Sequence, residues 1–176
     1  MANSRCSNVP DFVVSDCVFE SGRVVALAFV HKDVQTTIYT NPSNPALWVD
    51  GAYSSDIIIF KNVRGSFDGG SPIEVPGTGN QSTKVINADR TLTVMVQGVK
   101  GNEDVWNELV KEKGYRVAWV VGADYGTLFF NNVDTSIFAT APVEEGLDTE
   151  VMWNVTVKWK DVNLPKSSNV PTGIFE

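Results

Sequence analysis

Histidine and cysteine, the residues that most often build metal and nucleophilic sites, are scarce in this chain. Its 176 residues include one histidine, His31, and two cysteines, Cys6 and Cys17. Structural zinc takes four nitrogen or sulfur ligands, so this composition predicts no metal site. The N-terminal residues lack the apolar core of a secretion signal, and the two cysteines are therefore expected to be free thiols rather than a disulfide.

Positive charge and long apolar runs are also limited. Lys and Arg number 14 against 21 Asp and Glu, which gives a formal net charge of −7. A protein that grips nucleic-acid phosphates needs a basic stripe, but the densest cationic patch, Lys111 and Lys113, is interrupted by Glu112. No apolar run reaches the length of a membrane-spanning helix. The composition therefore predicts neither phosphate binding nor membrane insertion.

The clearest positive pattern lies in residues 150–160. Apolar and polar residues alternate strictly there, which is typical of a β-strand with one buried face. Two of the apolar residues are tryptophans, so this strand is expected to anchor a sheet that packs on another layer. The residues expected to face the core are Val151, Trp153, Val155, Val157 and Trp159.

One helix and further strands are predicted from the rest of the chain. Asn102 is a suitable N-cap, Glu103 and Asp104 follow it, and Gly114 suits a helix end, so residues 103–113 are expected to form the one helix. Apolar or alternating runs predict strands at 23–31, 56–63, 90–98, 115–121, 125–131 and 133–141, with a weaker strand candidate at 35–40.

This order of elements predicts a mainly β fold of the α+β type. We expect a β-sandwich or small barrel with one flanking α-helix, at about residues 103–113, and with extended loop and terminal arms. Residues 1–22 are interpreted as an N-terminal arm, 23–162 as the domain and 163–176 as a C-terminal arm. Within the domain, residues 65–81 hold five glycines and two prolines, which predicts a long exposed loop or a loose hairpin.

The candidate catalytic groups do not follow an enzyme motif. His31 could act with Asp33 and with Ser15 or Ser21, but no nucleophile-elbow pattern is present, and a histidine at a strand end is more often structural. The glycine-rich residues 65–79 lack the G-x-x-x-x-G-K-[ST] spacing of a phosphate loop. We therefore predict no catalytic residue, no cofactor and no enzymatic activity.

Residues 133–157 carry negative charge alone. The two carboxylates of a glycosidase face each other across a cleft, and adjacent acids on one turn rarely do so. A solvated turn is one interpretation of this segment. The other is a surface that repels phosphate and that, repeated around a ring, would let DNA pass without sticking. The acids concerned are Asp134, Glu144, Glu145, Asp148 and Glu150.

The five tryptophans also allow two interpretations. Exposed together, they would form a platform on which sugars stack, which keeps a carbohydrate-binding β-sandwich module open as an alternative. Four of the five lie in predicted strands or in the predicted helix, where core packing is the usual role. The tryptophans are Trp48, Trp106, Trp119, Trp153 and Trp159.

The order of these segments carries a family resemblance. The glycine-rich loop at 65–81 separates early strands, and the alternating residues 91–97 run directly into the predicted helix. Apolar hairpin strands follow, and the sequence Trp-Asn-Val-Thr-Val-Lys-Trp at 153–159 closes the sheet. Over roughly residues 20–160, this layout resembles the tail tube and tail-ring proteins of tailed bacteriophages and their relatives in contractile injection systems.

A second likeness concerns the N-terminal part of the chain. Cys6 and Cys17, followed by the sequence Val-Val-Ala-Leu-Ala-Phe at 24–29, are similar to structural proteins of phages with Bacteroidetes-type hosts. Together the two likenesses imply a virion structural protein that is assembled in the cytoplasm of a bacterial host and resides in the virion tail.

The resemblance implies partners. Tail tube proteins commonly join six copies into a ring, and the rings stack through loops and terminal arms around a channel for DNA. This chain would then bind itself and other virion proteins, and DNA would pass without specific binding. A capsid-decoration or head-neck protein is an alternative location in the same class of particle.

The resemblance also implies positions for two groups of residues. Subunit contacts would come from the long loop and the terminal arms, and the acidic turn would line the channel. The contact candidates are Gly65, Phe67, Ile73, Val75 and Phe175. The candidates for the channel lining are Glu144, Glu145 and Asp148.

Overall fold

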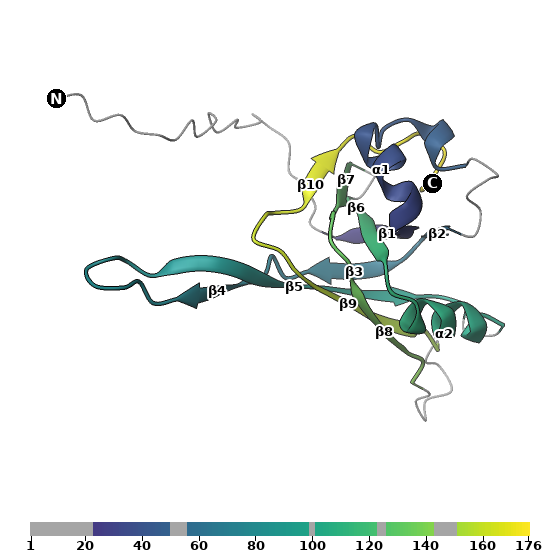
Figure 1. Cartoon of the computed structure of the whole chain (residues 1–176). Coiled ribbons are helices and arrows are strands. Elements are labelled where there is room, and N and C mark those ends of the chain that lie inside the picture. Colours follow the sequence, from purple (N-terminus) through teal and green to yellow (C-terminus); the bar gives the residue numbers. More distant parts are fainter. Residues whose placement is uncertain (1–22, 50–55, 99–100, 123–125, 143–150) are drawn as a thin grey trace.

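The structure is a computed structural model that describes residues 23–49, 56–98, 101–122, 126–142 and 151–176 (Figure 1). The predictions for the N-terminal arm, for the two cysteines and for the channel-lining acids therefore lie outside the described residues. The described helices are α1 (Lys32–Thr40), the 3-10 turn η1 (Pro45–Leu47) and α2 (Glu103–Lys111). The described strands are β1 (Val24–His31), β2 (Ile57–Phe60), β3 (Arg64–Phe67), β4 (Ser71–Val75), β5 (Lys84–Val96), β6 (Tyr115–Val121), β7 (Thr127–Phe130), β8 (Ser136–Thr140), β9 (Trp153–Lys160) and β10 (Lys166–Ser168).

The fold is mainly β, as predicted, and is consistent with a sandwich or barrel-like architecture. The described strands form one antiparallel sheet in the order β10-β7-β6-β1-β3-β5-β9-β8, with β2 paired to β1 and β4 paired to β5. The strongest sequence patterns are confirmed. The alternating residues near the C-terminus form β9, the apolar run that begins after Arg23 forms β1, and the predicted helix forms α2.

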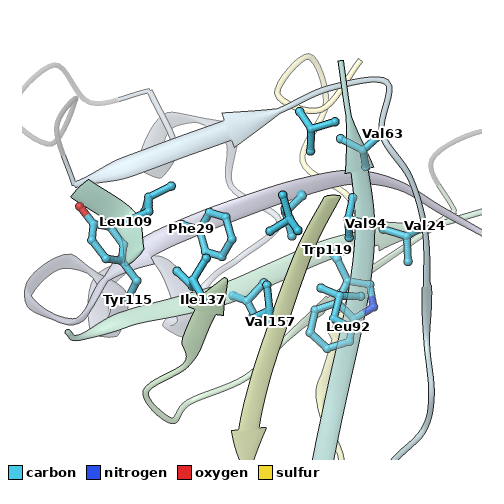
Figure 2. Packing of buried hydrophobic residues seen from close by; sticks show 14 of the residues in the cluster. Val24, Phe29, Val63, Leu92, Val94, Leu109, Tyr115, Trp119, Ile137 and Val157 are labelled. Carbon is cyan, nitrogen blue, oxygen red and sulfur yellow. The ribbon is translucent and has the colours of Figure 1, made fainter. Parts of the chain in front are cut away.

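The sheet curls so that two of its parts face each other across a first hydrophobic core. Trp119 on β6 and Trp159 on β9 lie with their ring centroids 5.6 Å apart, although three strands separate β6 from β9 in the sheet. Leu27 on β1 and Leu92 on β5 are fully buried in the same cluster, part of which Figure 2 shows. Helix α2 adds Trp106 and Leu109 to this core, which explains why so short a helix is stable.

A second core covers the opposite face of β1, β6 and β7. Ala26, Ala28 and Ala118 present small side chains there, which lets α1 approach the sheet closely. Val34 and Ile38 of α1 pack on this face, together with side chains from η1 and from the C-terminal segment. Strand β1 is therefore buried on both faces, as its nearly continuous apolar sequence predicts.

Helix α1 corrects the prediction of a strand at residues 35–40 and of one helix in the chain. The β-branched residues in this segment favour a strand, but Val34 and Ile38 stand four residues apart and place one apolar stripe against the sheet. His31 is the N-cap of this helix, and its Nδ1 accepts a hydrogen bond from the Asp33 amide at 3.4 Å. Tertiary burial therefore outweighs local propensity here.

Of the two structures predicted for residues 65–81, a long exposed loop or a loose hairpin, the structure shows the hairpin. The first residues of this segment belong to β3, which pairs with both β1 and β5, and residues 71–75 form β4, which pairs with β5. Pro72 is compatible with β4 because this strand pairs on one side with β5, and an edge strand tolerates a residue without an amide hydrogen. Residues 68–70 and 76–83 lie outside the strands, so about half of the glycine-rich segment is paired backbone.

The C-terminal segment, predicted as an extended arm at 163–176, returns to the domain. Strand β10 pairs with β7, and Ile174 and Phe175 are 6% and 0% exposed in the second core. The Phe175 ring packs edge-on against Trp48 at 5.2 Å. In the part of the chain that the structure describes, no helix combines the length and apolarity needed to cross a membrane.

Candidate assembly surface

The β4–β5 hairpin extends away from the two cores. Figure 1 shows β4 and the first part of β5 reaching out from the body, on the side opposite α2. Residues 84–87 of β5 pair with β4, whereas residues 89–96 pair with β9 and lie in the curled sheet. The hairpin thus continues a rigid core strand and is not attached through a flexible linker.

The base of the hairpin is fixed by polar contacts. The Asp68 carboxylate accepts hydrogen bonds from the Gly70 amide at 2.9 Å and from the Thr91 amide at 3.1 Å. The Asp161 amide, just beyond β9, donates to the Ala88 carbonyl at 3.1 Å. These contacts tie the start of β4 and the end of β9 to the middle of β5.

Arg90 completes the base of the hairpin. Its side chain is 5% exposed, and its guanidinium donates to the carbonyl oxygens of Gly69, of Asp161 at 3.5 Å and of Asn163 at 3.4 Å. Gly70 has a φ of +94°, and a Cβ there would lie 2.7 Å from the Arg90 side chain. A glycine is therefore required at this position, both for the backbone conformation and for the guanidinium.

The hairpin exposes large apolar side chains. Val75 on β4 is 43% exposed, and Val85 and Ile86 on β5 are 51% and 56% exposed. Scattered exposed apolar residues are ordinary, but Val75 and Val85 lie on two neighbouring rungs of one protruding element, and Ile86 follows at the register shift. The register shift between Ile73 and Glu74 adds local twist at this point. Ile73 and Val75 project from one face of the hairpin, whereas Val85, which lies opposite Glu74, projects from the other. These residues on the two faces, together with Ile86 at the register shift, are called the hairpin tip surface below.

A second exposed area is the outer face of β3, β5, β9 and β8. Its cross-strand neighbours include Thr93 opposite Thr156 and Met95 opposite Asn154. Phe138 on β8, opposite Thr156, is 63% exposed. The face is rich in hydroxyl and amide side chains. Neither of the two hydrophobic cores of the described residues covers it. This surface is called the outer sheet face below.

Two of the predicted contact residues have roles inside the chain. A Cβ at Gly65 would lie 2.4 Å from the Thr93 carbonyl oxygen, so this glycine lets β3 approach β5. The Phe67 ring lies 5.2 Å from the Trp119 ring and is stacked at 5.7 Å on that of Trp159. Both residues serve the first core.

The other three predicted contact residues divide between the hairpin and the second core. Ile73 is partly buried and Val75 is exposed, and the structure places both on β4 of the hairpin. Phe175 is fully buried within its own chain and presents no surface to a neighbour in this conformation. Val85 and Ile86 were not predicted as contact residues, because they lie after the segment 65–81 whose glycines and prolines indicated a loop or hairpin.

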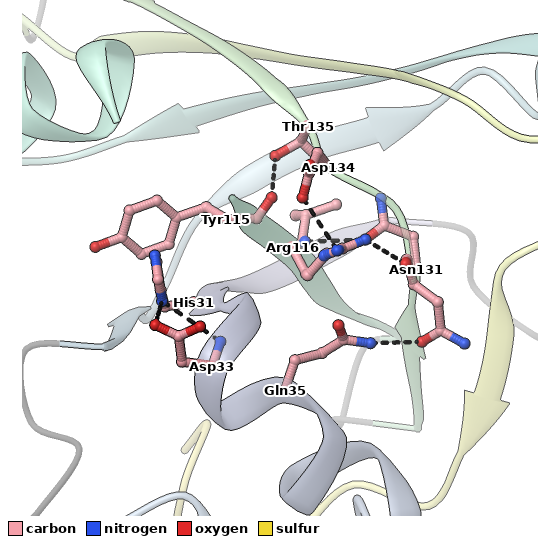
Figure 3. A network of polar contacts seen from close by, with 10 residues as sticks. His31, Asp33, Gln35, Tyr115, Arg116, Asn131, Asp134 and Thr135 are labelled. Carbon is pink, nitrogen blue, oxygen red and sulfur yellow. Dashed lines mark hydrogen bonds and ion pairs between the residues drawn. The ribbon is translucent and has the colours of Figure 1, made fainter. Parts of the chain in front are cut away.

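The polar residues around His31 form a structural cluster (Figure 3). His31 Nδ1 lies 3.2 Å from the Asp33 carboxylate, and Arg116 pairs with Asp134 at 3.1 Å. The Asn131 side chain accepts from the Val117 amide at 3.1 Å. Each contact fastens the end of one strand to a neighbouring element. The two serines considered as partners of His31 lie outside the described residues.

The geometry also bears on a metal site and on a sugar-binding platform. The described residues contain no group of three or more His, Cys, Asp or Glu side chains arranged to hold a metal ion. Trp48, Trp106, Trp119 and Trp159 are at most 4% exposed, and Trp153 is partly buried. This burial removes the exposed platform on which the carbohydrate-binding alternative depended.

Comparison of the chain with protein-family models, with curated proteins and with solved structures finds no match.

Proposed function

We propose that this protein is a self-assembling structural subunit of a phage tail tube or tail ring, and that it forms a channel through which DNA passes. The observation that carries the proposal is the rigid, protruding hairpin with an exposed apolar tip surface. A monomer derives no folding stability from exposing Val75, Val85 and Ile86, whereas burial in a neighbour would be favourable. The projecting geometry gives a partner access to both sides of the hairpin.

The hairpin favours a head-to-tail contact. A projecting element does not match itself across a two-fold axis unless two copies lie side by side, so it docks most simply on a different surface of the next copy. Such heterologous contacts close into a ring when the rotation between copies divides a full turn. The exposed edge of β4 would also gain a partner for its backbone groups, which removes the aggregation hazard of an open edge.

The outer sheet face does not supply the phosphate-repelling lining. Arg64, Lys158 and Lys160 lie on this face, where Asp89 pairs with Lys160 at 3.6 Å. Basic side chains attract the DNA backbone. The negative lining in this proposal therefore comes from Glu144, Glu145 and Asp148, which remain a prediction.

The test is the assembly state of the purified full chain. Light scattering coupled to size exclusion, over a wide concentration range, should show mass growth towards a fixed oligomer, and negative-stain microscopy should show rings or short tubes. The double variant Val85→Thr, Ile86→Thr should stay monomeric at concentrations at which the wild-type chain assembles. A chain that stays monomeric at millimolar concentration would overturn the proposal.

A matched variant tests whether the loss of assembly is specific to the hairpin tip surface or follows from any increase in surface polarity. Val49→Thr makes the same chemical change at a side chain that is 65% exposed but lies just after η1, outside the hairpin. Assembly should be retained in this variant. Equal loss of assembly in Val49→Thr and in the hairpin variant would contradict a specific role of the hairpin.

A further inference from the structure

An open cavity of about 530 Å³ lies between α2 and the ends of β1, β2 and β6. This volume falls within the range of small-ligand sites. The cavity is separate from the hairpin and from the outer sheet face. Its lining residues are His31, Asp56, Ile58, Asp104, Val105, Glu108, Leu109, Glu112 and Tyr115.

The cavity is strongly negative. Among the described residues that line it, four are carboxylates and none is a lysine or arginine. Within the described residues, no ion pair involves Asp56, Asp104, Glu108 or Glu112. Lys113, the next residue after Glu112, lines a different cavity at the base of the hairpin. No described lysine or arginine forms an ion pair with these carboxylates, which come from two separate parts of the chain.

Tyr115 adds a hydroxyl group to the cavity. The residue as a whole is 9% exposed, its hydroxyl oxygen is not fully enclosed, and no hydrogen bond joins this hydroxyl to another described residue. Its burial, together with the charges of Glu112, Asp56 and Glu108, raises the pKa of this hydroxyl above its usual range. The hydroxyl therefore stays protonated and faces the carboxylates as a neutral group that can donate or accept.

Two aromatic rings form one side of the cavity. The imidazole of His31 and the ring of Tyr115 meet edge to face with centroids 5.4 Å apart, and Figure 3 shows both at the end of β1 and β6. The face of a tyrosine ring attracts cations. Ile58, Val105 and Leu109 add an apolar floor suited to an aliphatic chain.

We propose that this cavity binds an organic cation, a guanidinium or primary ammonium group carried on an aliphatic chain. The carboxylates would neutralise the charge and accept its hydrogen bonds, the Tyr115 hydroxyl would take a further bond, and the apolar residues would contact the chain. A bare metal ion fits less well, because the described acidic side chains do not converge on one point. The same chemistry has two sources: a free polyamine, or an arginine or lysine side chain of a polypeptide, including a second copy of this chain.

The first experiment measures binding of defined probes to the full chain. N-acetyl-arginine amide and spermidine are titrated at physiological salt, with calorimetry and with the ring resonances of Tyr115 in NMR as readouts. N-acetyl-citrulline amide, which has the shape of the arginine probe without its charge, is the control. We expect saturable shifts of Tyr115 with both cations and at least about tenfold weaker binding of the citrulline probe.

Variants then assign the binding to the cavity. Glu108→Gln with Glu112→Gln should weaken binding of both cations by about tenfold or more. Glu103→Gln removes one charge from the same helix but lies outside the cavity, and it should change binding less than about twofold. Tyr115→Phe tests the hydroxyl alone and is expected to weaken binding by about fivefold.

The outcomes decide whether the cavity binds cations and indicate whether the natural cation is a free polyamine or a polypeptide side chain. Absence of Tyr115 shifts at millimolar probe, equal binding of the citrulline probe, or equal losses in Glu103→Gln and the double variant would each overturn the proposal. Tighter binding of spermidine than of the arginine probe assigns the site to a free polyamine, and the reverse order assigns it to a polypeptide side chain.

Discussion

The two parts of β5 share one continuous strand but lie in opposite environments. From residue 88 onwards every second side chain is buried, and the strand lies between β3 and β9. Residues 84–87 pair with β4 alone, and most of their side chains are exposed. The buried part therefore determines the fold, and the exposed part is available to a partner.

This difference shows how a rigid interaction element can be built without its own core. A two-stranded hairpin is marginally stable in water by itself. Here the long strand β5 transmits the order of the sheet into the hairpin, and Asp68 and Arg90 fix its exit direction. A preorganised hairpin loses less conformational entropy on binding than a disordered loop of the same length would.

The largest effect is expected from the buried part of β5. Leu92→Ala removes a fully buried side chain from the first core and should lower the free energy of unfolding by about 2–5 kcal/mol, because it leaves a cavity. Chemical denaturation measures this loss. Thr93→Ala, on the exposed side of the same strand, is the control and should change stability by less than about 0.5 kcal/mol. Equal losses in both variants would remove the asymmetry between the two faces.

A smaller loss is expected where β3 meets β5. Gly65→Ala would place a Cβ 2.4 Å from the Thr93 carbonyl oxygen, and the backbone must shift, at a cost of about 1–3 kcal/mol. Gly126→Ala is the matched control, since its nearest contact would be an ordinary 3.4 Å. Thermal unfolding compares the two variants. An unchanged melting temperature in Gly65→Ala would argue against the close approach of the two strands.

The junction between the two parts of β5 can be loosened selectively. Arg90→Met keeps much of the buried aliphatic volume but removes the hydrogen bonds to three carbonyl oxygens, at a cost of about 1–2 kcal/mol. Hydrogen exchange should speed up at the amides of Gly70 and Thr91, while amides in the centre of β6 keep their protection. Uniform acceleration throughout the sheet would mean that Arg90 supports the whole fold rather than the hairpin.

The smallest effect on stability is expected at the hairpin tip surface. Val85→Thr with Ile86→Thr should change the free energy of unfolding of the monomer by less than about 0.5 kcal/mol, because both side chains are exposed. Denaturation at a concentration below that of assembly isolates this term. A loss of several kcal/mol would show that the tip supports the monomer, and the contrast between the two parts of β5 would then fail.

The sequence was most informative where local pattern and burial agree. The alternation in β9 predicts a strand with one buried face, and the continuous apolar run of β1 predicts a strand buried on both faces. The structure shows both burial patterns. Helix α1 was missed because Thr36, Thr37 and Ile38 favour a strand locally, and its apolar stripe gains its energy from a sheet formed by distant residues. Two features of the sequence could have indicated this helix. Val34 and Ile38 are spaced four residues apart, and the acidic residue Asp33 lies in the first turn, just after the N-cap His31.

The candidate surfaces were predicted in part. The glycine and proline content of residues 65–81 indicated an excursion from the core, and the hairpin lies partly in that range. The role of Phe67 could not be predicted, because its partners Trp119 and Trp159 come from β6 and β9. The acidic cavity was missed for the same reason, since Asp56 and Glu112 are brought together only by the packing of α2.

The burial of Ile174 and Phe175 has a consequence for the order of folding during synthesis. Trp48 and helix α1 lie early in the numbering, yet they share one core with these two side chains. This second core can therefore close only after the chain has been made through residue 175.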